Sequence, residues 1–315
     1  MTEREALDWL LDSDPALRWQ VLNDLTDAPA EEVAAERARI ATEGWGAELL
    51  SRQRPDGVFG PIGDGAPDPD AVNMRTVVAL RAMGLDPASD AAQTAIGGLR
   101  DSEEWLKVLE PGWAWYDRPF FAGETEPCIN GRVVAVGAYF GVDVESVVER
   151  LIGEQMADGG WNCEQENGST VGSFHTTINV LEGLLEHEQA TGGTPETGAA
   201  RRRGEAYLLS RRLMRRLSTG QLIRPDFLLF RFPPSWRYDV LRALDYFRLT
   251  GERPTDQMGE PIDVVAQKRG TDGRWLLEDR YPDEEILDLR ETEGEPSRWN
   301  TLRAMRVLRW AERAE

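Results

Sequence analysis

The sequence predicts an all-α fold made of repeated helical hairpins. Six segments carry apolar residues at the three- and four-residue spacing of an amphipathic helix. Their first residues are about 50 to 60 positions apart, which leaves room for two helices and two loops in each repeat. Signals of β-strands are nearly absent, because no segment alternates apolar and polar residues between hairpin turns. We expect residues 1–315 to form a single domain of this kind.

Each repeat is expected to contain two helices. The repeats open with the segments 17–25, 73–83, 128–140, 175–185, 238–247 and 299–308. Gly84, Gly141 and Gly251 follow three of these segments closely, as glycine commonly does at a helix C-terminus. A second, more amphipathic helix is expected over 31–53, 144–155, 197–217 and 261–268, with 3–11 as a candidate partner for the last repeat.

Three of the second helices lead into a loop of shared sequence. The loops are Gln53-Arg-Pro-Asp-Gly-Val-Phe59, Gln155-Met-Ala-Asp-Gly-Gly-Trp161 and Gln267-Lys-Arg-Gly-Thr-Asp-Gly-Arg-Trp275. A glutamine at a helix end can bond exposed backbone groups, and Asp-Gly favours a tight turn. The aromatic ring is expected to seal the contact between neighbouring hairpins.

The composition argues against several classes of function. The chain carries 36 Lys and Arg against 56 Asp and Glu, which gives a net charge of −20. Nucleic-acid binding is not expected, because it needs a basic face. No apolar run reaches the roughly 20 residues of a membrane-spanning helix, so we expect a soluble, cytoplasmic protein without a membrane span. Two cysteines cannot form a disulfide framework in a chain of this length, and the oligomeric state is left open.

Five segments carry a family resemblance together with the three loops. The segments are 14–22, 159–163, 173–185, 232–247 and 296–305. They resemble the squalene cyclase-like or prenyltransferase-like bacterial proteins of the terpenoid cyclase and protein prenyltransferase superfamily, and the loops look like its QW motifs. The resemblance implies an α/α toroid, with six parallel inner helices around an apolar cavity and outer helices around them. An open helical solenoid is the alternative, and the QW-like loops favour closure.

Two adjacent repeats begin with residues that suit a metal. Glu126 and Cys128 open the third repeat, and His175 opens the fourth. Neighbouring helix axes are about 8 to 10 Å apart, so side chains in their first turns can reach a common point. Glu126, Cys128 and His175 therefore form a candidate zinc site with an open fourth position. The alternative is a buried cysteine and a capping histidine, and Cys163 is expected to be a buried thiol or a further ligand.

The family resemblance implies the same metal residues. The β subunits of protein prenyltransferases have Asp-x-Cys at one inner-helix start and a histidine within Tyr-His-Thr at the next. Glu126-Pro-Cys128 and Phe174-His175-Thr176 look like these motifs, with glutamate in place of aspartate. Zinc held there would activate a thiol, hydroxyl or water near neutral pH.

Asp70 is a second candidate for chemistry. The segment Asp68-Pro-Asp70-Ala71 partly matches the Asp-x-Asp-Asp motif of cyclases that protonate an alkene, with alanine in place of the last aspartate. Helix capping is the alternative role.

Further residues are predicted near the same mouth of the cavity. Tyr238 and Asp239 are candidate catalytic residues. Arginine and tyrosine side chains suit a diphosphate or carboxylate headgroup. The candidate substrate-binding residues are Arg118, Trp236, Arg237, Arg298 and Trp299. Alternatively, the arginines are a repeated structural device and the tryptophans pack in the interior.

These observations lead to three hypotheses about function. The first is a zinc-dependent enzyme that acts on an isoprenoid or other apolar substrate in a central cavity. The second is a non-catalytic toroid that binds an apolar ligand or a protein partner. The third is a proton-initiated terpene cyclase with a degenerate acid motif.

Overall fold

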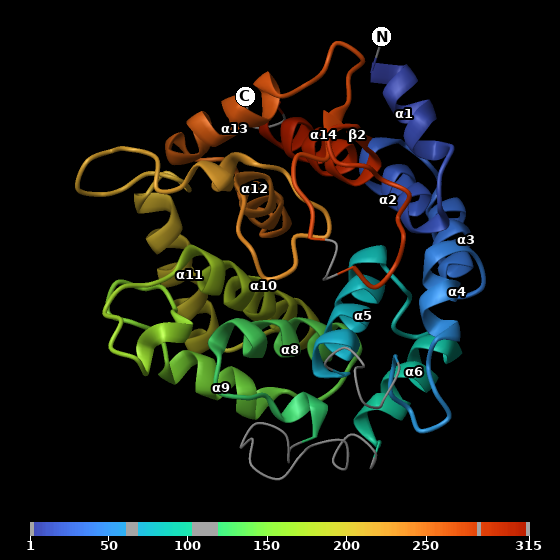
Figure 1. Ribbon diagram of the computed structural model, residues 1–315, viewed down its shortest axis with the longest axis horizontal. Coiled ribbons are helices and arrows are strands. Elements are labelled where there is room, and N and C mark those ends of the chain that lie inside the picture. The colour runs from blue at the N-terminus through green and yellow to red at the C-terminus, as the bar shows by residue number, and fades with distance from the viewer. Residues whose placement is uncertain (1–2, 61–68, 103–118, 282–284, 313–315) are drawn as a thin grey trace. The chain divides into compact units, whose positions relative to one another are not determined.

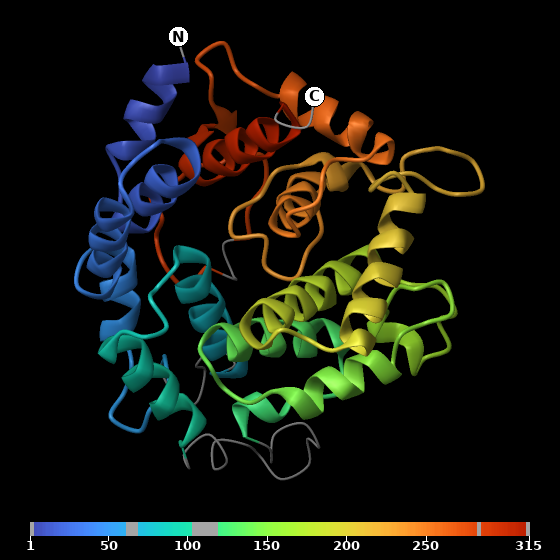
Figure 2. The same ribbon diagram turned by 180° about the vertical axis from the view of Figure 1, so that it is seen from behind.

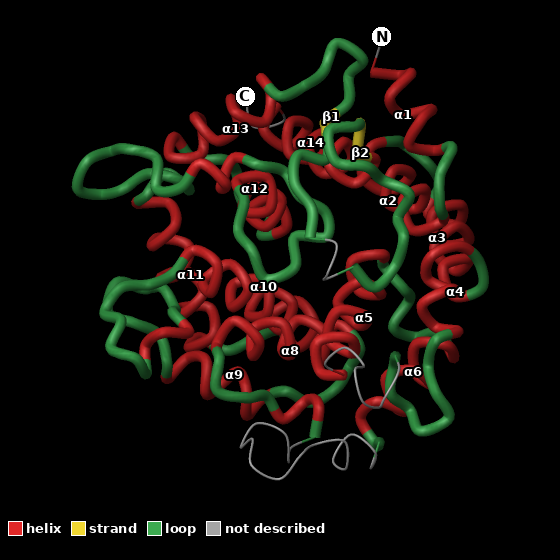
Figure 3. The backbone as a smooth tube through the Cα atoms, viewed as in Figure 1, coloured by secondary structure: helices red, strands yellow, loops and turns green. Residues whose placement is uncertain are grey.

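The protein is helical, as the sequence predicts. The computed structural model describes residues 3–60, 69–102, 119–281 and 285–312. Helices make up 59% of the structure, and its strands are two segments of two residues, so the all-α class is confirmed (Figure 3). Strand β1 (Trp275–Leu276) pairs antiparallel with β2 (Pro296–Ser297). No helix in these ranges is both long and apolar enough to cross a lipid bilayer.

The chain divides into two compact units. One, here called the terminal unit, consists of Met1–Arg37 and Ala206–Glu315, and the other, the central unit, is Ala38–Glu205. A single domain over residues 1–315 stays a prediction.

In the terminal unit, the last long helix is the packing centre. Helix α14 packs against α2, α12 and α13, while α1 packs against α2. The helices are α1 (Glu3–Leu11), α2 (Pro15–Leu25), α3 (Ala30–Ala38, which ends one residue beyond the boundary), η4 (Pro225–Leu228), α12 (Val240–Leu249), η5 (Asp256–Met258), α13 (Gly259–Gln267) and α14 (Arg298–Glu312). The contact of α2 with α14 joins the first and the last predicted repeat.

In the central unit, α8 is the packing centre. It packs against α5, α9 and α10. The helices are η1 (Arg39–Ala41), α4 (Gly44–Ser51), α5 (Pro69–Met83), α6 (Asp90–Arg100), η2 (Phe120–Ala122), α8 (Pro127–Tyr139), α9 (Glu145–Gly153), η3 (Cys163–Gln165), α10 (Phe174–Thr191) and α11 (Pro195–Ser210, which runs past the boundary).

Two glycines let α8 and α10 touch backbone to backbone. A Cβ atom at Gly131 would lie 2.5 Å from the carbonyl carbon and oxygen of Asn179, and one at Gly183 would lie 2.4 Å from the carbonyl oxygen of Gly131. A larger side chain at either position would force the helices apart. The first turns of both helices contact Cys163, so the helices start at the same end and run in the same direction. Figures 1 and 2 show them side by side.

The three predicted loops share one structure when they are aligned on the aromatic residue. Phe59, Trp161 and Trp275 are buried. The residue two positions earlier is in each case a glycine with positive φ, which other residues adopt only at a cost: Gly57, Gly159 and Gly273 have φ of 89°, 90° and 75°. The indole N–H of each tryptophan donates to the carbonyl ten residues earlier, with a distance of 2.7 Å in both cases. The repeat is therefore a repeat of structure as well as of sequence.

Glutamine joins two of these loops to the following helix. The side-chain amide of Gln53 donates to the carbonyl of Gly57 at 2.8 Å and to that of Ala95 in α6 at 2.7 Å. Gln155 repeats this pattern with Gly159 and with Ala200 in α11, at 2.7 and 2.8 Å. Each glutamine thus ties the end of one helix to another helix of the central unit.

In the third loop, the sequence prediction aligned Gln267 with Gln53 and Gln155, and this alignment is wrong. Gln267 is the last residue of α13 and is exposed, whereas Arg269 occupies the place six residues before Trp275. The guanidinium of Arg269 lies 5.8 Å from the centre of the Trp275 ring. The two extra residues in this loop hid the correct alignment.

Several predicted helix bounds also need correction. The helix expected over 31–53 is broken into α3, η1 and α4, because Gly44 has a φ of 65°. The helix expected over 197–217 ends at Ser210, where Arg212 and Leu213 turn the chain with φ of 45° and 59°. Helix α6 was not predicted, although Ala92, Ala95, Ile96 and Leu99 are buried at the spacing of an amphipathic helix.

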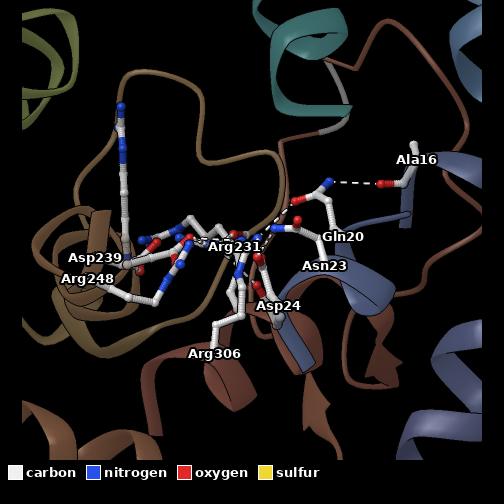
Figure 4. A network of polar contacts seen from close by, with 12 residues as sticks. Ala16, Gln20, Asn23, Asp24, Arg231, Asp239, Arg248 and Arg306 are labelled. Atoms are coloured by element: carbon white, nitrogen blue, oxygen red, sulfur yellow. Dashed lines mark hydrogen bonds and ion pairs between the residues drawn. The ribbon is translucent and has the colours of Figure 1, made fainter. Parts of the chain in front are cut away.

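A buried charge network holds α2, α12 and α14 together. The carboxylate of Asp245 lies 2.9 Å from Arg248, 3.0 Å from Arg306 and 3.8 Å from Arg303, and Arg306 also lies 3.0 Å from Asp24. Figure 4 shows Arg306, Asp24 and Arg248 within this network. Burial acts to raise the pKa of Asp245, but Arg306, Arg248 and Arg303 outweigh it and lower this pKa to about 2. Asp245 is therefore ionised and paired in the folded protein.

We expect Gly159→Ala to destabilise the central unit by about 1 to 3 kcal/mol. An added Cβ would meet the carbonyl oxygen of Arg203 at 2.6 Å and would force alanine into positive φ. The matched control is Gly153→Ala in α9, where no atom lies within 4 Å and alanine favours the helix. Urea unfolding measures both, and equal effects would contradict the proposed role of the loop glycine.

We expect Asp245→Asn to lower stability at neutral pH by about 2 kcal/mol. The folded pKa is below the ordinary value of 3.8, so the stabilisation is complete above about pH 4 and is lost as the pH falls toward about 2. As the pH falls from about 4 to about 2, the variant should therefore lose less stability than the parent, because it has no carboxylate to protonate at this position. Thermal unfolding at several pH values measures the difference, with the exposed Asp263→Asn as control. Parallel curves for parent and variant would contradict the prediction.

Candidate metal centre

A buried asparagine fixes the loop that precedes α8. The side chain of Asn130 accepts a hydrogen bond from the backbone N–H of Glu124 and donates one to the carbonyl of the same residue, both at 2.7 Å. The carboxylate of Glu124 in turn accepts from the backbone N–H of Glu126 at 2.9 Å, and burial raises the pKa of Glu124. Pro127 then starts the helix at a position where no N–H donor is needed. Glu126 and Cys128 are thereby held on either side of the helix start.

Cys163 follows the second shared loop and opens η3. The backbone N–H of Trp161 donates to the hydroxyl of Thr177 at 3.0 Å, and the Trp161 carbonyl accepts from the N–H of Ser173 at 2.7 Å. These bonds place the loop against the first turn of α10. The sulfur of Cys163 consequently lies 3.5 Å from the hydroxyl of Thr176.

Glu126, Cys128 and Cys163 form one cluster. One carboxylate oxygen and the two sulfurs all lie within 4.8 Å of one another. The Cys128 sulfur is 3.5 Å from Oε2 of Glu126. Cys128 is buried, while Glu126 and Cys163 are half-buried, so the cluster is open to solvent on one side.

The two cysteines shift each other's pKa in opposite directions. Interaction with Cys163 raises the pKa of Cys128, and burial adds to the effect. Interaction with Cys128 lowers the pKa of Cys163 against the effect of burial, with help from the hydroxyl of Thr176 and from the backbone N–H of Cys128. Of the two thiols, Cys163 is therefore the easier to deprotonate.

The donor set fits zinc. Two thiols and a carboxylate are ligands that zinc accepts, and two sulfurs bound to a tetrahedral zinc are about 3.8 Å apart. Both sulfurs and the carboxylate can reach such positions from within 4.8 Å of one another by small side-chain movements. Three protein ligands leave a fourth position for a water, a substrate group or another side chain, which is the pattern of catalytic zinc.

His175, the third predicted ligand, is not part of this cluster. Cys163 is grouped with Glu126 and Cys128, and the His175 ring is not among the groups within 4.8 Å of one another. His175 is the second residue of α10 and is half-buried, next to Thr176. Its role as a ligand stays a prediction. The sequence signal for Cys163 was its position directly after the Gly-Gly-Trp loop.

Tyr238 and Asp239 lie in the terminal unit and have structural contacts. The Tyr238 hydroxyl is buried and donates to the carbonyl of Leu213 at 2.6 Å, and burial raises the pKa of Tyr238 well above 10. Asp239 caps α12 by accepting the backbone N–H of Arg242 at 2.8 Å. Burial raises the pKa of Asp239, although Arg303 opposes it. These contacts agree with structural roles, and catalytic roles stay predictions.

Trp236 and Arg237 form an aromatic stack with a cation. The Arg237 guanidinium lies 4.5 Å from the ring centre of Trp236 and 3.4 Å from that of Tyr281. Trp236 is exposed. These two ring contacts explain the position of the Arg237 side chain without a bound ligand.

Arg298 and Trp299 also have contacts within the protein. Arg298 donates to the carbonyl of Asp12 at 3.0 Å and lies 4.5 Å from the ring centre of Trp9. Trp299 is buried and stacks on Phe232 at 4.2 Å. Both residues match the structural alternative, and their roles in substrate binding stay predictions.

Three residues named in the sequence predictions are not fully described. Arg118 and Asp68 lie outside the described residues. Asp70 lies in the first turn of α5, and only its backbone is described.

Comparison with known proteins leaves the resemblance untested. No protein-family model matches the chain, and no curated protein matches it closely enough to show a relationship. The chemistry of the site therefore has to be argued from its own residues.

We expect Asn130→Ala to destabilise the central unit by about 1 to 3 kcal/mol, because it removes two hydrogen bonds in a buried position. The control is Asn167→Ala, which removes a single exposed bond to Glu164 and should change stability by less than about 0.5 kcal/mol. Denaturant unfolding measures both. An equally small change for Asn130→Ala would show that the loop before α8 does not depend on this side chain.

Proposed function

We propose that the chain is a zinc-dependent enzyme that acts on an isoprenoid or other apolar substrate. The observation that carries the proposal is the cluster of Glu126, Cys128 and Cys163 at the adjoining starts of two parallel helices. When bound, zinc lowers the pKa of a coordinated thiol, hydroxyl or water and so supplies a nucleophile near neutral pH. Thiol ligands must stay reduced, which favours a cytoplasmic location.

The residues of the chain have separate tasks in this proposal. Cys163 and Cys128 would supply two sulfurs, each after its proton is released to solvent. Glu126 supplies the carboxylate. Asn130 and Glu124 hold the backbone of Glu126 and so fix the direction from which it reaches the cluster. The half-buried side leaves a route for a substrate.

An α/α toroid is the architecture that we propose for the whole chain. The first and last predicted inner helices, α2 and α14, pack against each other, whereas an open solenoid would separate its first and last repeats. The parallel contact of α8 and α10 and the shared loops add support. The apolar substrate rests on the resemblance to terpenoid cyclases and prenyltransferases, from which the chain departs by using glutamate for aspartate and by adding Cys163.

We expect purified protein to contain about one zinc per chain. Cys128→Ser and Cys163→Ser should each lower zinc affinity by at least about tenfold, because a lost ligand is not replaced. Glu126→Gln tests the carboxylate, with the exposed Glu166→Gln as its matched control. Elemental analysis and competition with a chelating dye measure content and affinity. A folded protein that binds no zinc in zinc-containing buffer would overturn the proposal.

Substrate tests separate the enzyme from a binding protein. Zinc-loaded protein should convert a polyprenyl diphosphate or a polyprene, and Cys128→Ser or a chelator should abolish product. Mass spectrometry of an organic extract identifies any lipid that co-purifies. A retained lipid with no turnover of any isoprenoid would favour the non-catalytic alternative.

His175→Ala tests the fourth ligand. A tenfold or greater fall in zinc affinity would assign His175 to the fourth position, whereas unchanged affinity would assign it to a solvent or substrate atom.

A further inference from the structure

The only two cysteines of the chain lie side by side. Cys128 is in the first turn of α8 and Cys163 opens η3, yet their sulfurs lie within 4.8 Å of each other. Nothing in zinc binding requires both cysteines of the chain to meet at one point, because histidine and carboxylate ligands serve as well. Their proximity gives the cluster a second chemistry.

We propose that Cys128 and Cys163 are an oxidation site that forms a reversible intramolecular disulfide. A peroxide, or a small-molecule disulfide, is the class of oxidant that the pair would meet. The disulfide itself requires only the two sulfurs. Its regulatory meaning rests on the proposed function, since one disulfide removes both sulfur ligands of the zinc site.

The burial of the two residues sets the order of reaction. Cys163 is half-buried and Cys128 is buried, so an oxidant reaches Cys163 first. The Thr176 hydroxyl, 3.5 Å from the Cys163 sulfur, is a polar neighbour for an oxidised sulfur. Cys128 is the more buried residue of the pair, and its sulfur is close enough to react with the oxidised sulfur of Cys163. Cys163 is thus the sulfur that reacts with the oxidant, and Cys128 is the sulfur that then converts the product into a disulfide.

The reaction balances without a further reactant. The sulfur of Cys163 attacks one oxygen of hydrogen peroxide, the O–O bond breaks, and a sulfenic acid and one water result. The sulfur of Cys128 then attacks the sulfenic sulfur, the S–O bond breaks, and the oxygen leaves as a second water with the thiol proton. Two electrons pass from the two sulfurs to the peroxide, and one S–S bond forms. A dithiol reverses the change by two thiol–disulfide exchanges.

The two sulfurs must move closer for the bond to form. A disulfide needs Cα atoms about 4.4 to 6.8 Å apart and S–S contact near 2 Å. Cys163 lies in a short helical turn outside the long helices, whereas Cys128 is fixed by Pro127 and the packing of α8. The closing movement is therefore expected in the short segment that carries Cys163, and α8 and α10 keep their glycine contact.

The experiment uses the full chain after removal of metal by a chelator. Treatment with a small excess of hydrogen peroxide should lower the intact mass by about 2 Da and remove both thiols together, and dithiothreitol should restore them. Peptide mapping should find the Cys128 peptide linked to the Cys163 peptide. Separate oxygen adducts on the two cysteines, or a disulfide between two chains, would overturn the proposal.

Two variants test the order of reaction. Cys128→Ser should stop at an adduct of a single oxygen, or of glutathione, on Cys163. Cys163→Ser should leave Cys128 at least about tenfold slower to react than Cys163 in the other variant. The reverse order would contradict the assignment of roles. The mass change of the unaltered chain remains decisive if a variant does not fold.

A zinc arm separates this proposal from the proposed function. Protein loaded with zinc should form the disulfide at least about tenfold more slowly than the metal-free protein. A disulfide without any zinc binding would support the oxidation site and overturn the zinc enzyme. Zinc binding with no disulfide from the metal-free chain would support the zinc enzyme and overturn the oxidation site.

Discussion

Close backbone contact at glycines is the constraint on which the remaining structure depends. In each shared loop a glycine with positive φ turns the chain, so that the aromatic residue two positions later is buried and its backbone N–H reaches the next long helix. In the central unit these glycines also face neighbouring backbone, with Gly57 against Gly98 and Gly159 against Arg203. A side chain there would need both an unfavourable φ and a displaced neighbour. The helices are therefore held at fixed spacing by the loops as much as by their apolar faces.

The same kind of contact creates the candidate site. Gly131 and Gly183 bring α8 and α10 into close contact, and the segment after Trp161 lies beside the first turns of both helices. Cys128 comes from one helix and Cys163 from the loop, and neither would meet the other if the helices were spaced by larger side chains. The candidate metal ligands and the thiol pair are thus two consequences of one packing arrangement. This is why zinc and oxidants are expected to compete.

The arginines of the terminal unit have partners within the protein. Arg298 donates to the carbonyl of Asp12 and Arg237 stacks against aromatic rings, as the structural alternative expects, and their roles in substrate binding stay predictions. Arg303 and Arg306 of α14 pair with carboxylates of two other helices, Asp245 in α12 and Asp24 in α2. Burying these charges is tolerable only because each has a partner, and removal of one partner leaves the others uncompensated. The main role of Arg303 and Arg306 is to hold α2, α12 and α14 together.

The sequence by itself determined the helical class, five of the six repeat pairs and the loops, because apolar periodicity and Asp-Gly turns are local signals. It also placed Glu126 and Cys128 at a helix start. Only the tertiary structure decided that Cys163 joins them, that Arg269 rather than Gln267 aligns with the other loop glutamines, and that Tyr238 bonds Leu213. These outcomes depend on which helices touch and how closely. Residues distant in the chain, such as Gly131 and Gly183, set that distance, and no local pattern records it.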